Sequence, residues 1–493
     1  MQQTGENVIL TIAEYNQLVS DNKWLHEQLA QLKRLIFGAK SERFISTEPD
    51  ASQLKLELSS ATAQEDIKTP EKEEITYQRE KKEKNKPVRK ELSPNLPRRE
   101  EVLEPENLPE GAKKIGESVT EILEYEPCEI YVRRIVRPKY VVKKEEGVEI
   151  ITADLPSLPL PRSNAGAGLL TYVIISKYVD HLPFYRLAKI LKRSGAEIAE
   201  NTINGWYVAA CNLLEPLYEE MKKQVQKSDY IQADETPIRV LTSEKPGSSH
   251  KGYYWVYHSP PKRLVVFDYQ KGRDQSGPND MLKDFIGKLQ TDGYAAYTQF
   301  GLREGIELLA CMAHVRRKFE QSIDNYPDIA NYVLGEILKL YALEREALEK
   351  NCKADEILKM RQEKALPIMD NLEKYILEKR NHVVPKSSIG MAIGYALNLW
   401  KRLKVYLTDP KILIDNNLIE NTIRPVALGR KNYLFAGSHE AAQRAAMMYS
   451  FLGTCKLNNV EPFTWLKDTI EKIPDCKISN LKELFPGYKK QEC

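Results

Sequence analysis

Three short acidic segments, far apart in the chain, carry the residue types that could perform metal-dependent chemistry. They are Tyr230–Pro237 (YIQADETP), Thr291–Tyr294 (TDGY) and Ile414–Glu420 (IDNNLIE). Each places a carboxylate at the end of a strand-like run or near the start of a helix. Carboxylates that converge in this way can hold two divalent metal ions, an arrangement common in enzymes that cut and join phosphodiesters. The pattern predicts an enzyme that transfers nucleic-acid strands.

Spacing alone leaves the reacting acid of the first segment open. Pro237 is tolerated at a strand end or edge and not in a central ladder, so Asp234 and Glu235 should both project near a strand end. In the second segment Asp292 precedes a glycine, and Asp-Gly is a common turn pair. Each acid taken singly is more often a turn or cap residue than a catalytic one. Their joint order favours one shared site.

The third segment is predicted to begin a helix, with Asp415 or Asn416 as its cap. Asn416, Glu420 and Arg424 follow at i, i+4 spacing and therefore share one helix face. An amide, a carboxylate and a guanidinium on one face suit a cleft that holds metal and phosphate. The same spacing also fits an exposed Glu–Arg pair with a structural role only.

Cys311 and His314 are spaced as two ligands that could begin a zinc site. No second pair accompanies them, so we expect His314 to be a hydrogen-bonding residue beside the acids. Basic residues near these segments and in an earlier helical region are candidates for contact with DNA phosphates. They are Lys189, Lys192, Arg193, Arg316, Arg317, Lys318, Arg424, Arg430 and Lys431.

A run of strands must position the first two acids. Alternating and β-branched residues predict strands at Tyr230–Val240, Gly252–His258 and Arg263–Tyr269, then a short helix at Met281–Lys288. A further strand would end at Asp292. Three consecutive strands, a helix and a strand that ends in an acid is the order expected of a ribonuclease-H-like core. Residues 322–400 are predicted to form a helical insertion between the second and third acids, and residues 411–475 further helices.

The region just before the strands predicts a helical DNA-binding block. Leu182–Arg193 and Asn201–Leu214 are predicted helices with Gly195 in the turn between them, and Asn201 and Thr202 are plausible caps. Helix, short glycine-containing turn, helix is the helix-turn-helix pattern. Any two packed helices can show this spacing, so the basic residues of the first helix add the main support for DNA binding.

The N-terminal region carries a heptad pattern. Leu18, Leu25 and Leu32 fit d positions, and Asn22 at an a position favours a parallel dimer in one register. We expect this helix to join two copies of the chain, although packing on its own chain fits the pattern equally well.

A charged, aromatic-poor linker separates this helix from a small β-rich module. The module is predicted from strands at Ser118–Tyr125 and Cys128–Val136. A basic cluster on it could contact phosphate or only aid solubility; its members are Arg133, Arg134, Arg137 and Lys139. The predicted divisions are 11–45 (coiled coil), 46–95 (disordered linker), 96–160 (β-rich module), 161–227 (helix-turn-helix block), 228–450 (catalytic domain) and 451–493 (C-terminal helices).

Composition sets wider limits. The 493 residues suffice for two to four domains, and a hydrophobic content of 42% supports real cores. Net charge is only +3, from 73 Lys+Arg against 70 Asp+Glu, so any DNA surface must come from local clustering. The seven cysteines are scattered, which fits a reducing compartment. Without a signal peptide or an apolar run of membrane-spanning length, the sequence predicts a cytoplasmic, nucleoid-associated protein with no membrane partner.

The sequence resembles transposases of the bacterial insertion-sequence-66 family over nearly its whole length. The matching segments are Phe37–Arg43 (FGAKSER), Lys177–Arg186 (KYVDHLPFYR), Ala233–Pro237 (ADETP), Asp292–Tyr294 (DGY), Cys311–Phe319 (CMAHVRRKF) and Asp415–Asn432 (DNNLIENTIRPVALGRKN). The last of these is long and highly specific, so agreement by chance is negligible.

This resemblance implies a multidomain α+β protein with a ribonuclease-H-like catalytic domain and an Asp-Asp-Glu triad. Matched position by position, the triad falls on Asp234, Asp292 and Glu420, and so selects Asp234 over Glu235. It implies two Mg²⁺ (or Mn²⁺) ions, binding of double-stranded DNA at terminal inverted repeats and at the target, and transfer of a 3′-hydroxyl to target DNA. Homodimers or larger assemblies through residues 11–37, and small accessory proteins of the same element, are the expected partners.

The sequence departs from the family at one place. The family commonly carries a zinc-binding segment with two Cys pairs, but Leu108–Gly116 and Pro138–Lys144 contain no cysteine, so we expect the module to fold without zinc.

Three rival functions remain. A catalytically inactive, transposase-derived DNA-binding regulator is disfavoured by the three intact acids. A carboxylate-pair glycosidase leaves the coiled coil and helix-turn-helix without a role, and a coiled-coil scaffold would not need residues 228–320.

Overall fold

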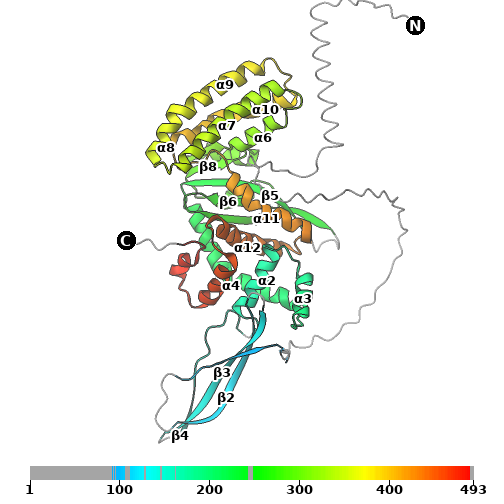
Figure 1. The fold of residues 1–493 in the computed structure, drawn as a ribbon, viewed down its shortest axis with the longest axis vertical. Coiled ribbons are helices and arrows are strands. Elements are labelled where there is room, and N and C mark those ends of the chain that lie inside the picture. The colour runs from blue at the N-terminus through cyan, green and yellow to red at the C-terminus, as the bar shows by residue number, and fades with distance from the viewer. Residues whose placement is uncertain are drawn as a thin grey trace, which may run out of the picture.

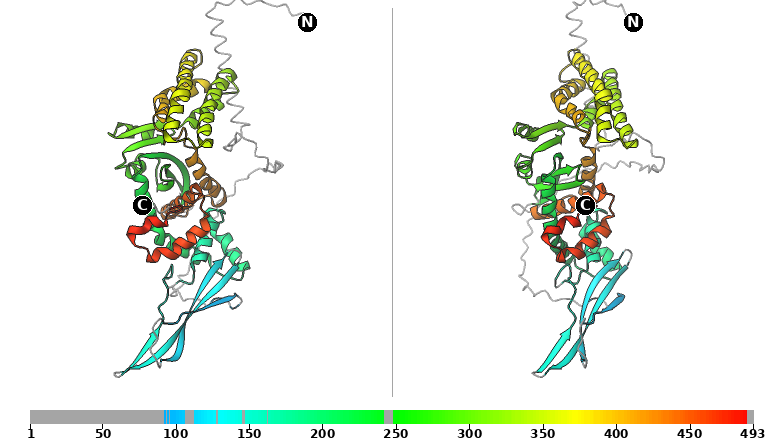
Figure 2. Two further views of the ribbon diagram at one scale, coloured as in Figure 1. Left: turned by 60° about the vertical axis from the view of Figure 1, so that its left-hand side comes forward. Right: turned by 90° about the vertical axis from the view of Figure 1, so that its left-hand side faces the viewer.

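The computed structural model describes the chain from Leu92 to Tyr488, except residues 93, 95, 106–111, 127–128, 145–146, 162 and 242–247. The predicted coiled coil at 11–45 and nearly all of the predicted linker lie outside the described residues. The described part is a mixed α+β structure with two sheets. Figures 1 and 2 show a β-ribbon at one end, a helical group at the other and the second sheet between them.

The ribbon is the predicted β-rich module, with longer strands than expected. It comprises β1 (Arg98–Val102), β2 (Lys113–Glu126), β3 (Glu129–Lys144) and β4 (Gly147–Thr152), in the order β1-β3-β2 with β4 also on β3. The prediction ended the second strand at Val136, just before Pro138. The structure accommodates this proline because, along one side of β3, the pairing with β1 ends at Val136 and the pairing with β4 starts at Lys139. Pro138 therefore falls in the gap between these two partners.

Ion pairs neutralise much of the basic cluster predicted on this module. Arg133 Nη2 lies 2.7 Å from Glu101 Oε2, and Arg134 forms an ion pair with Glu100. Arg137 donates to the carbonyl of Ala153. These arginines therefore tie β1 and the segment that follows β4 to β3. This is a structural role, different from both the phosphate contact and the solubility considered for them.

Three helices follow: α2 (Ala167–Tyr178), α3 (Phe184–Arg193) and α4 (Glu200–Gln226). Gly195 has φ +89, as a turn between two helices requires. The predicted caps of the last helix were wrong, because Ala199 is its N-cap and no side chain caps it. The predicted end at Leu214 was also wrong. The helix continues through Pro216 because its second half is buried, with Leu217, Met221 and Val225 fully covered.

The second sheet has the order β7-β6-β5-β8-β9. Its strands are β5 (Tyr230–Leu241), β6 (Ser249–Ser259), β7 (Leu264–Gln270), β8 (Gly287–Thr291) and β9 (Ile306–Ala310). The first three are antiparallel to one another, and β8 and β9 run parallel to β5. The predicted ranges of these first three strands agree with the structure. The expectation that Asp234 and Glu235 lie near a strand end was wrong, because β5 continues past Pro237 to Leu241. The proline is tolerated there because β6 is the only described strand that pairs with β5 beyond Gln232. The short helix was misplaced, since α5 spans Ser276–Met281, and β9 was not predicted.

The edge strand β7 is protected by a helix. Ser450 Oγ and Thr454 Oγ1, one turn apart on α12 (His439–Leu457), accept hydrogen bonds from the backbone N–H groups of Phe267 (2.8 Å) and Val265 (3.2 Å). A free sheet edge is an aggregation risk, and this helix removes it. The polar residues of α12 thus have a structural role on the face that meets the sheet.

The helical end of the molecule has its own core. It is built from α6 (Met312–Glu320), α7 (Pro327–Glu349), α8 (Ala354–Met360), α9 (Leu366–Arg380) and α10 (Ser388–Lys404). The chain then returns through α11 (Asn417–Tyr433), which lies against β5 and β6. None of the described helices is long and apolar enough to cross a membrane.

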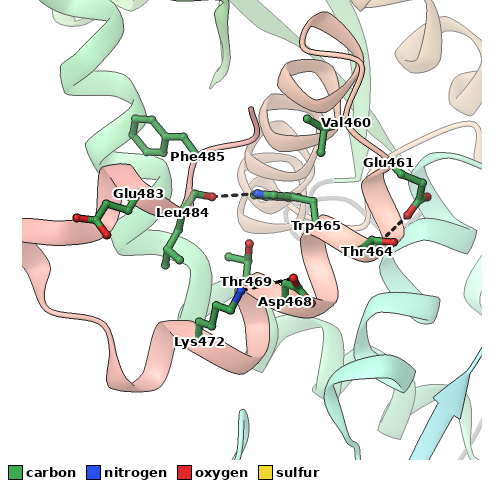
Figure 3. Close-up of a pocket in the computed structure, with 10 residues that line it drawn as sticks. All are labelled: Val460, Glu461, Thr464, Trp465, Asp468, Thr469, Lys472, Glu483, Leu484 and Phe485. Carbon is green, nitrogen blue, oxygen red and sulfur yellow. Dashed lines mark hydrogen bonds and ion pairs between the residues drawn. The ribbon is translucent and has the colours of Figure 1, made fainter. Parts of the chain in front are cut away.

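The C-terminal helix α13 (Pro462–Lys472) and the turn Ile478–Leu484 line a hollow of about 330 Å³ (Figure 3). Trp465 Nε1 donates to the carbonyl of Leu484 at 2.9 Å across it. None of the residues with a predicted site role lines this hollow, so it offers no support for the predicted chemistry.

Candidate active site

The first two acids lie side by side because of strand register. In the parallel pair β5–β8, Gln232 is level with Gln290. Asp234 follows two residues later on β5, and Asp292 follows two residues later, just past the end of β8. The segments therefore share a pattern, Gln-x-Asp, that places both acids just beyond the point where the β5–β8 pairing ends.

The negative charges of the neighbouring acids act on the carboxyl group of Asp234. Burial raises the pKa of this carboxyl well above its usual range, and the charges of Glu235, Asp292 and Glu420 raise it further. Its Oδ1 accepts a hydrogen bond from the backbone N–H of Glu235 at 2.8 Å. The three carboxylates predicted to act together are thus within electrostatic reach of one another.

Asp292 sits in a turn that only glycine can continue. Its Oδ1 accepts the N–H of Tyr294 at 2.8 Å, and Gly293 has φ +87. A Cβ on Gly293 would also lie 2.8 Å from the Leu399 side chain. The Tyr395 hydroxyl of α10 donates to the Asp292 carbonyl. The turn after β8 is therefore fixed both locally and by the helical end of the molecule.

Glu420 lies in the first turn of α11 and already has a cationic partner. Arg317 Nη2 of α6 donates to its Oε2 at 2.8 Å, and His314 Nε2 is 3.7 Å from its Oε1. Glu420 Oε1 and His314 Nδ1 are buried without a hydrogen-bond partner. Burial lowers the pKa of His314, while the charges of Glu420 and Asp292 partly counter that shift. The charges of both the second and the third acid thus act on His314.

A buried amide pair beneath the acids ties the third segment to the strands. Gln232 Nε2 donates to Gln290 Oε1 (2.7 Å) and to the carbonyl of Asp415 (2.8 Å), and Gln290 Nε2 donates to the carbonyl of Leu413 (3.0 Å). Tyr230 Oη donates to the same Gln290 oxygen at 2.6 Å. Both glutamines are essentially unexposed. They position the segment that leads into α11, and so position Glu420 against Asp234 and Asp292.

Sequence reasoning missed these glutamines, although a signal was present. A polar amide within an otherwise apolar strand is unusual, because burial without hydrogen bonds is costly. A glutamine stands two residues before an acid in both segments, and this repetition indicates that the two glutamines serve the same structural role.

One of the two predicted caps of α11, Asn416, does occupy the N-cap position, and both residues make further contacts. Asp415 Oδ1 accepts the N–H of Asn417 (3.0 Å), and its Oδ2 accepts the hydroxyl of Tyr341 (2.7 Å). Asn416 is the N-cap by position, but its side chain makes no cap bond. It is fully buried, with Cys311 Sγ 2.9 Å from its Oδ1. The Cys311 thiol thus anchors the helix start, and Asn416 lies beneath the surface.

Glu235 differs from Asp234 in having a cation beside it. Arg273 Nε donates to Glu235 Oε1 at 2.9 Å, and its guanidinium lies 4.0 Å from the centre of the Tyr294 ring. Burial raises the pKa of Glu235, and the hydrogen bond from Arg273 opposes this. Arg273 was not predicted as a site residue. Arg273 therefore compensates the negative charge of Glu235, whereas Asp234 has no such hydrogen bond from a cation among the contacts described above.

The predicted DNA-binding residues fall on several elements, and many of them already have partners. Lys192 pairs with Glu197, Arg316 with Glu320, and Arg430 with the carbonyl of Pro237. Arg317 differs from these in that its partner is one of the three acids, Glu420. The exposed members of this set are Lys189, Lys192, Arg193, Arg317, Lys318, Arg424 and Lys431.

The chemistry of the donors fits a hard divalent cation, since such ions prefer carboxylate oxygens. A buried acid with raised pKa and an unpaired carboxylate oxygen on Glu420 are both features that a bound cation would relieve. In the described part of the chain, however, no group of three or more His, Cys, Asp or Glu side chains is arranged as a ready metal site. Arg317 forms an ion pair with Glu420, whose other carboxylate oxygen has no hydrogen-bond partner.

One buried histidine in this network predicts a pH dependence of stability. His258 is 2% exposed and its Nδ1–H donates to Gln232 Oε1 at 2.9 Å; burial lowers the pKa of His258 to about 4. The unfolded chain, with a pKa near 6.5, binds this proton first as the pH falls. The free energy of unfolding should therefore fall by about 3 kcal/mol between pH 6.5 and 4 through this group.

The check is urea unfolding of wild type and His258→Gln across this range. The variant should show a smaller loss of stability on acidification, whereas His382→Gln, at an exposed position, should behave like wild type. Equal pH dependence in all three proteins would contradict the assignment.

Comparison with known proteins gives three matches along the chain. Residues 162–444 match the family described as "Transposase IS66 family", residues 24–100 match "Transposase C of IS166 homeodomain", and residues 450–486 match "IS66 C-terminal element". Two uncharacterised proteins of Sinorhizobium fredii are similar over nearly their full length. The protein y4qI is 31% identical, covering 96% of this chain and 92% of its own, and y4jD is 29% identical, covering 94% of each.

Proposed function

Because the chain belongs to the IS66 family of transposases, we propose that it binds the terminal inverted repeats of an insertion sequence and catalyses metal-dependent cleavage and strand transfer of DNA. The observation that supports the proposal is that the charges of Asp292, just after β8, and Glu420, on α11, both act on the carboxyl of Asp234 on β5. A ribonuclease-H-like core is supported by a sheet in which three antiparallel strands are extended by two parallel ones.

In this proposal Asp234, Asp292 and Glu420 hold Mg²⁺ or Mn²⁺. Such ions, when bound, supply activation of a water or 3′-hydroxyl and stabilisation of the leaving oxygen. The protein's own residues contribute position and charge. Gln232 and Gln290 hold the strands and the start of α11 in register. Arg317 pairs with Glu420 and would be a cation available to a DNA phosphate beside the acids.

DNA would approach over the basic residues of α3, α6 and α11. Helices α3 and α4 would supply the helix-turn-helix for recognition of the element ends, and the N-terminal segment would pair two protomers so that two ends can be joined. Small accessory proteins of the element are further candidate partners. No covalent enzyme–DNA intermediate is needed, because the acids act through water and the DNA's own 3′-hydroxyl.

The test is cleavage of a labelled duplex from the end of the element that flanks this gene, with Mg²⁺ or with EDTA. Wild type should nick the end only with Mg²⁺, and Glu420→Gln should lose this activity. Glu349→Gln, at an exposed position at the end of α7, is the matched control and should keep it.

Specific binding of the ends without nicking would favour the second candidate, an inactive transposase-derived DNA-binding regulator. The observation on its side is the ion pair of Arg317 with Glu420, which engages one of the three acids. If the wild-type protein neither bound nor nicked the element end, both candidate functions would be contradicted.

A further inference from the structure

The turn that follows α11 has a backbone conformation that leucine rarely adopts. Leu434 has φ +60 and ψ −44, and the carbonyl of Tyr433 accepts a hydrogen bond from the N–H of Phe435 at 2.6 Å. This is a three-residue γ-turn with positive φ at its centre, a rare and strained form. Strained backbone persists only where the surrounding structure enforces it, and it concentrates at functional sites.

The surrounding structure enforces this turn from both sides. The N–H of Leu434 donates to the carbonyl of Arg430 in the last turn of α11 (3.1 Å). Two residues later, Ala436 exchanges hydrogen bonds with the end of β5, donating to Arg239 (2.8 Å) and accepting from Leu241 (2.9 Å). Ser438 then caps α12. The turn is therefore fixed in position by α11 before it, α12 after it and β5 beside it, and we call residues 434–435 the projection.

This fixed projection displays apolar side chains to solvent. Leu434 is 63% exposed and Phe435 is 43% exposed. Neither contributes to the buried core, so the strain is not compensated by packing of these side chains.

The charges beside the projection are mainly cationic. Arg430 and Lys431 lie in the last turn of α11, and Arg239 lies on the adjoining end of β5. The nearest acid along the chain is Glu440, in the first turn of α12. An apolar tip flanked by arginine and lysine is the combination with which proteins grip phosphates and insert a side chain between base pairs.

The distance to the acids matches a short length of duplex. Along α11, Leu434 lies about 21 Å from Glu420 at ~1.5 Å per residue. Along β5, Val240, which bridges to Ala436, lies about 20 Å from Asp234 at ~3.3 Å per residue. DNA rises ~3.4 Å per base pair, so either path corresponds to roughly six base pairs.

We propose that Leu434 and Phe435 form an apolar wedge that enters the stack of the bound element end, roughly six base pairs from the phosphate that is cut. Arg430 and Lys431 would hold the phosphates on either side. Unstacking at this step bends the duplex toward the acids and fixes which phosphate reaches them. The proposal rests on the proposed transposase function and adds to it the element that sets register on the DNA.

The test uses the full-length protein and element-end duplexes that carry 2-aminopurine at one position, moved from three to nine base pairs from the cut. Binding is measured in EDTA, so that no cleavage intervenes. Wild type should raise the fluorescence at one or two adjacent positions, because 2-aminopurine brightens when it unstacks. Phe435→Ala should abolish this signal and weaken binding roughly 10- to 100-fold.

Leu434→Gly is a second variant that accepts the positive φ while removing the side chain. It should also lose the signal without loss of thermal stability. Leu302→Ala, which removes an apolar side chain that is 88% exposed elsewhere on the surface, is the matched control and should keep it.

Specific binding by wild type with no fluorescence change at any position would overturn the wedge and leave the proposed function standing. The same holds if Phe435→Ala keeps the full signal. Failure of wild type to bind element-end DNA would contradict both the wedge and the proposed function.

Discussion

Asp234→Asn is expected to reduce DNA-end cleavage by about 10³-fold or more while leaving end binding unchanged. The amide keeps the size of the side chain and removes the charge needed to hold a divalent ion next to Asp292 and Glu420. Single-turnover cleavage of a labelled end, with binding measured in parallel, separates the two effects. Loss of binding together with cleavage would instead indicate that Asp234 acts in DNA recognition or folding.

Glu235→Gln is the matched control on the adjacent residue. Glu235 is compensated by Arg273, so we expect it to support the site and not to hold metal. The variant should retain most of the activity that Asp234→Asn loses. If Glu235→Gln were the more damaging change, the assignment of Asp234 as the first acid of the triad would be wrong.

The same Asp234→Asn change should stabilise the fold. Burial and neighbouring acids raise the pKa of Asp234, so the folded chain keeps this proton to a higher pH than the unfolded chain does. Wild type therefore loses stability as the pH rises from 3.8 through the folded pKa, and the amide does not. The thermal midpoint of the variant at neutral pH should exceed that of wild type, as expected where a site is built at the expense of stability.

Arg361→Met is expected to lower the free energy of unfolding by about 3–5 kcal/mol, the largest change in stability that we predict. The Arg361 side chain is 2% exposed and makes two bonds to Glu344, of 2.9 and 2.6 Å. It also donates to the carbonyls of Tyr406 (2.7 Å), Asp409 (2.8 Å) and Ile412 (3.0 Å). Removal of the guanidinium leaves a partly buried carboxylate and three carbonyls without their donor.

This variant should also cleave DNA more slowly, because residues 406–412 lead into the segment that carries Glu420. Urea unfolding gives the stability, and Lys359→Met, at an exposed position on α8, serves as the control that should change it by less than about 1 kcal/mol. Similar small effects of both substitutions would mean that the guanidinium contributes no more than a surface charge does.

The sequence alone determined the features that depend on local pattern. Strands at Tyr230, Gly252 and Arg263 follow from alternation and β-branching, and Gly195 had to be the turn between two helices. Family membership followed from long motifs. Which residues complete the active site stays a proposal, although the Gln-x-Asp repeat that aligns two of the acids is present in the amino-acid sequence itself.

Only the tertiary structure decided what depends on partners distant in the chain. The helix from Glu200 continues past Pro216 because burial outweighs the local effect of proline. Strand β3 passes through Pro138 because its neighbours leave a gap there. Arg273 compensates Glu235 and Arg317 compensates Glu420 through contacts that spacing does not encode. The γ-turn at Leu434 exists because β5 holds Ala436. Local propensities specify where elements form, but register and burial decide which side chains meet, because those energies arise only after the elements pack.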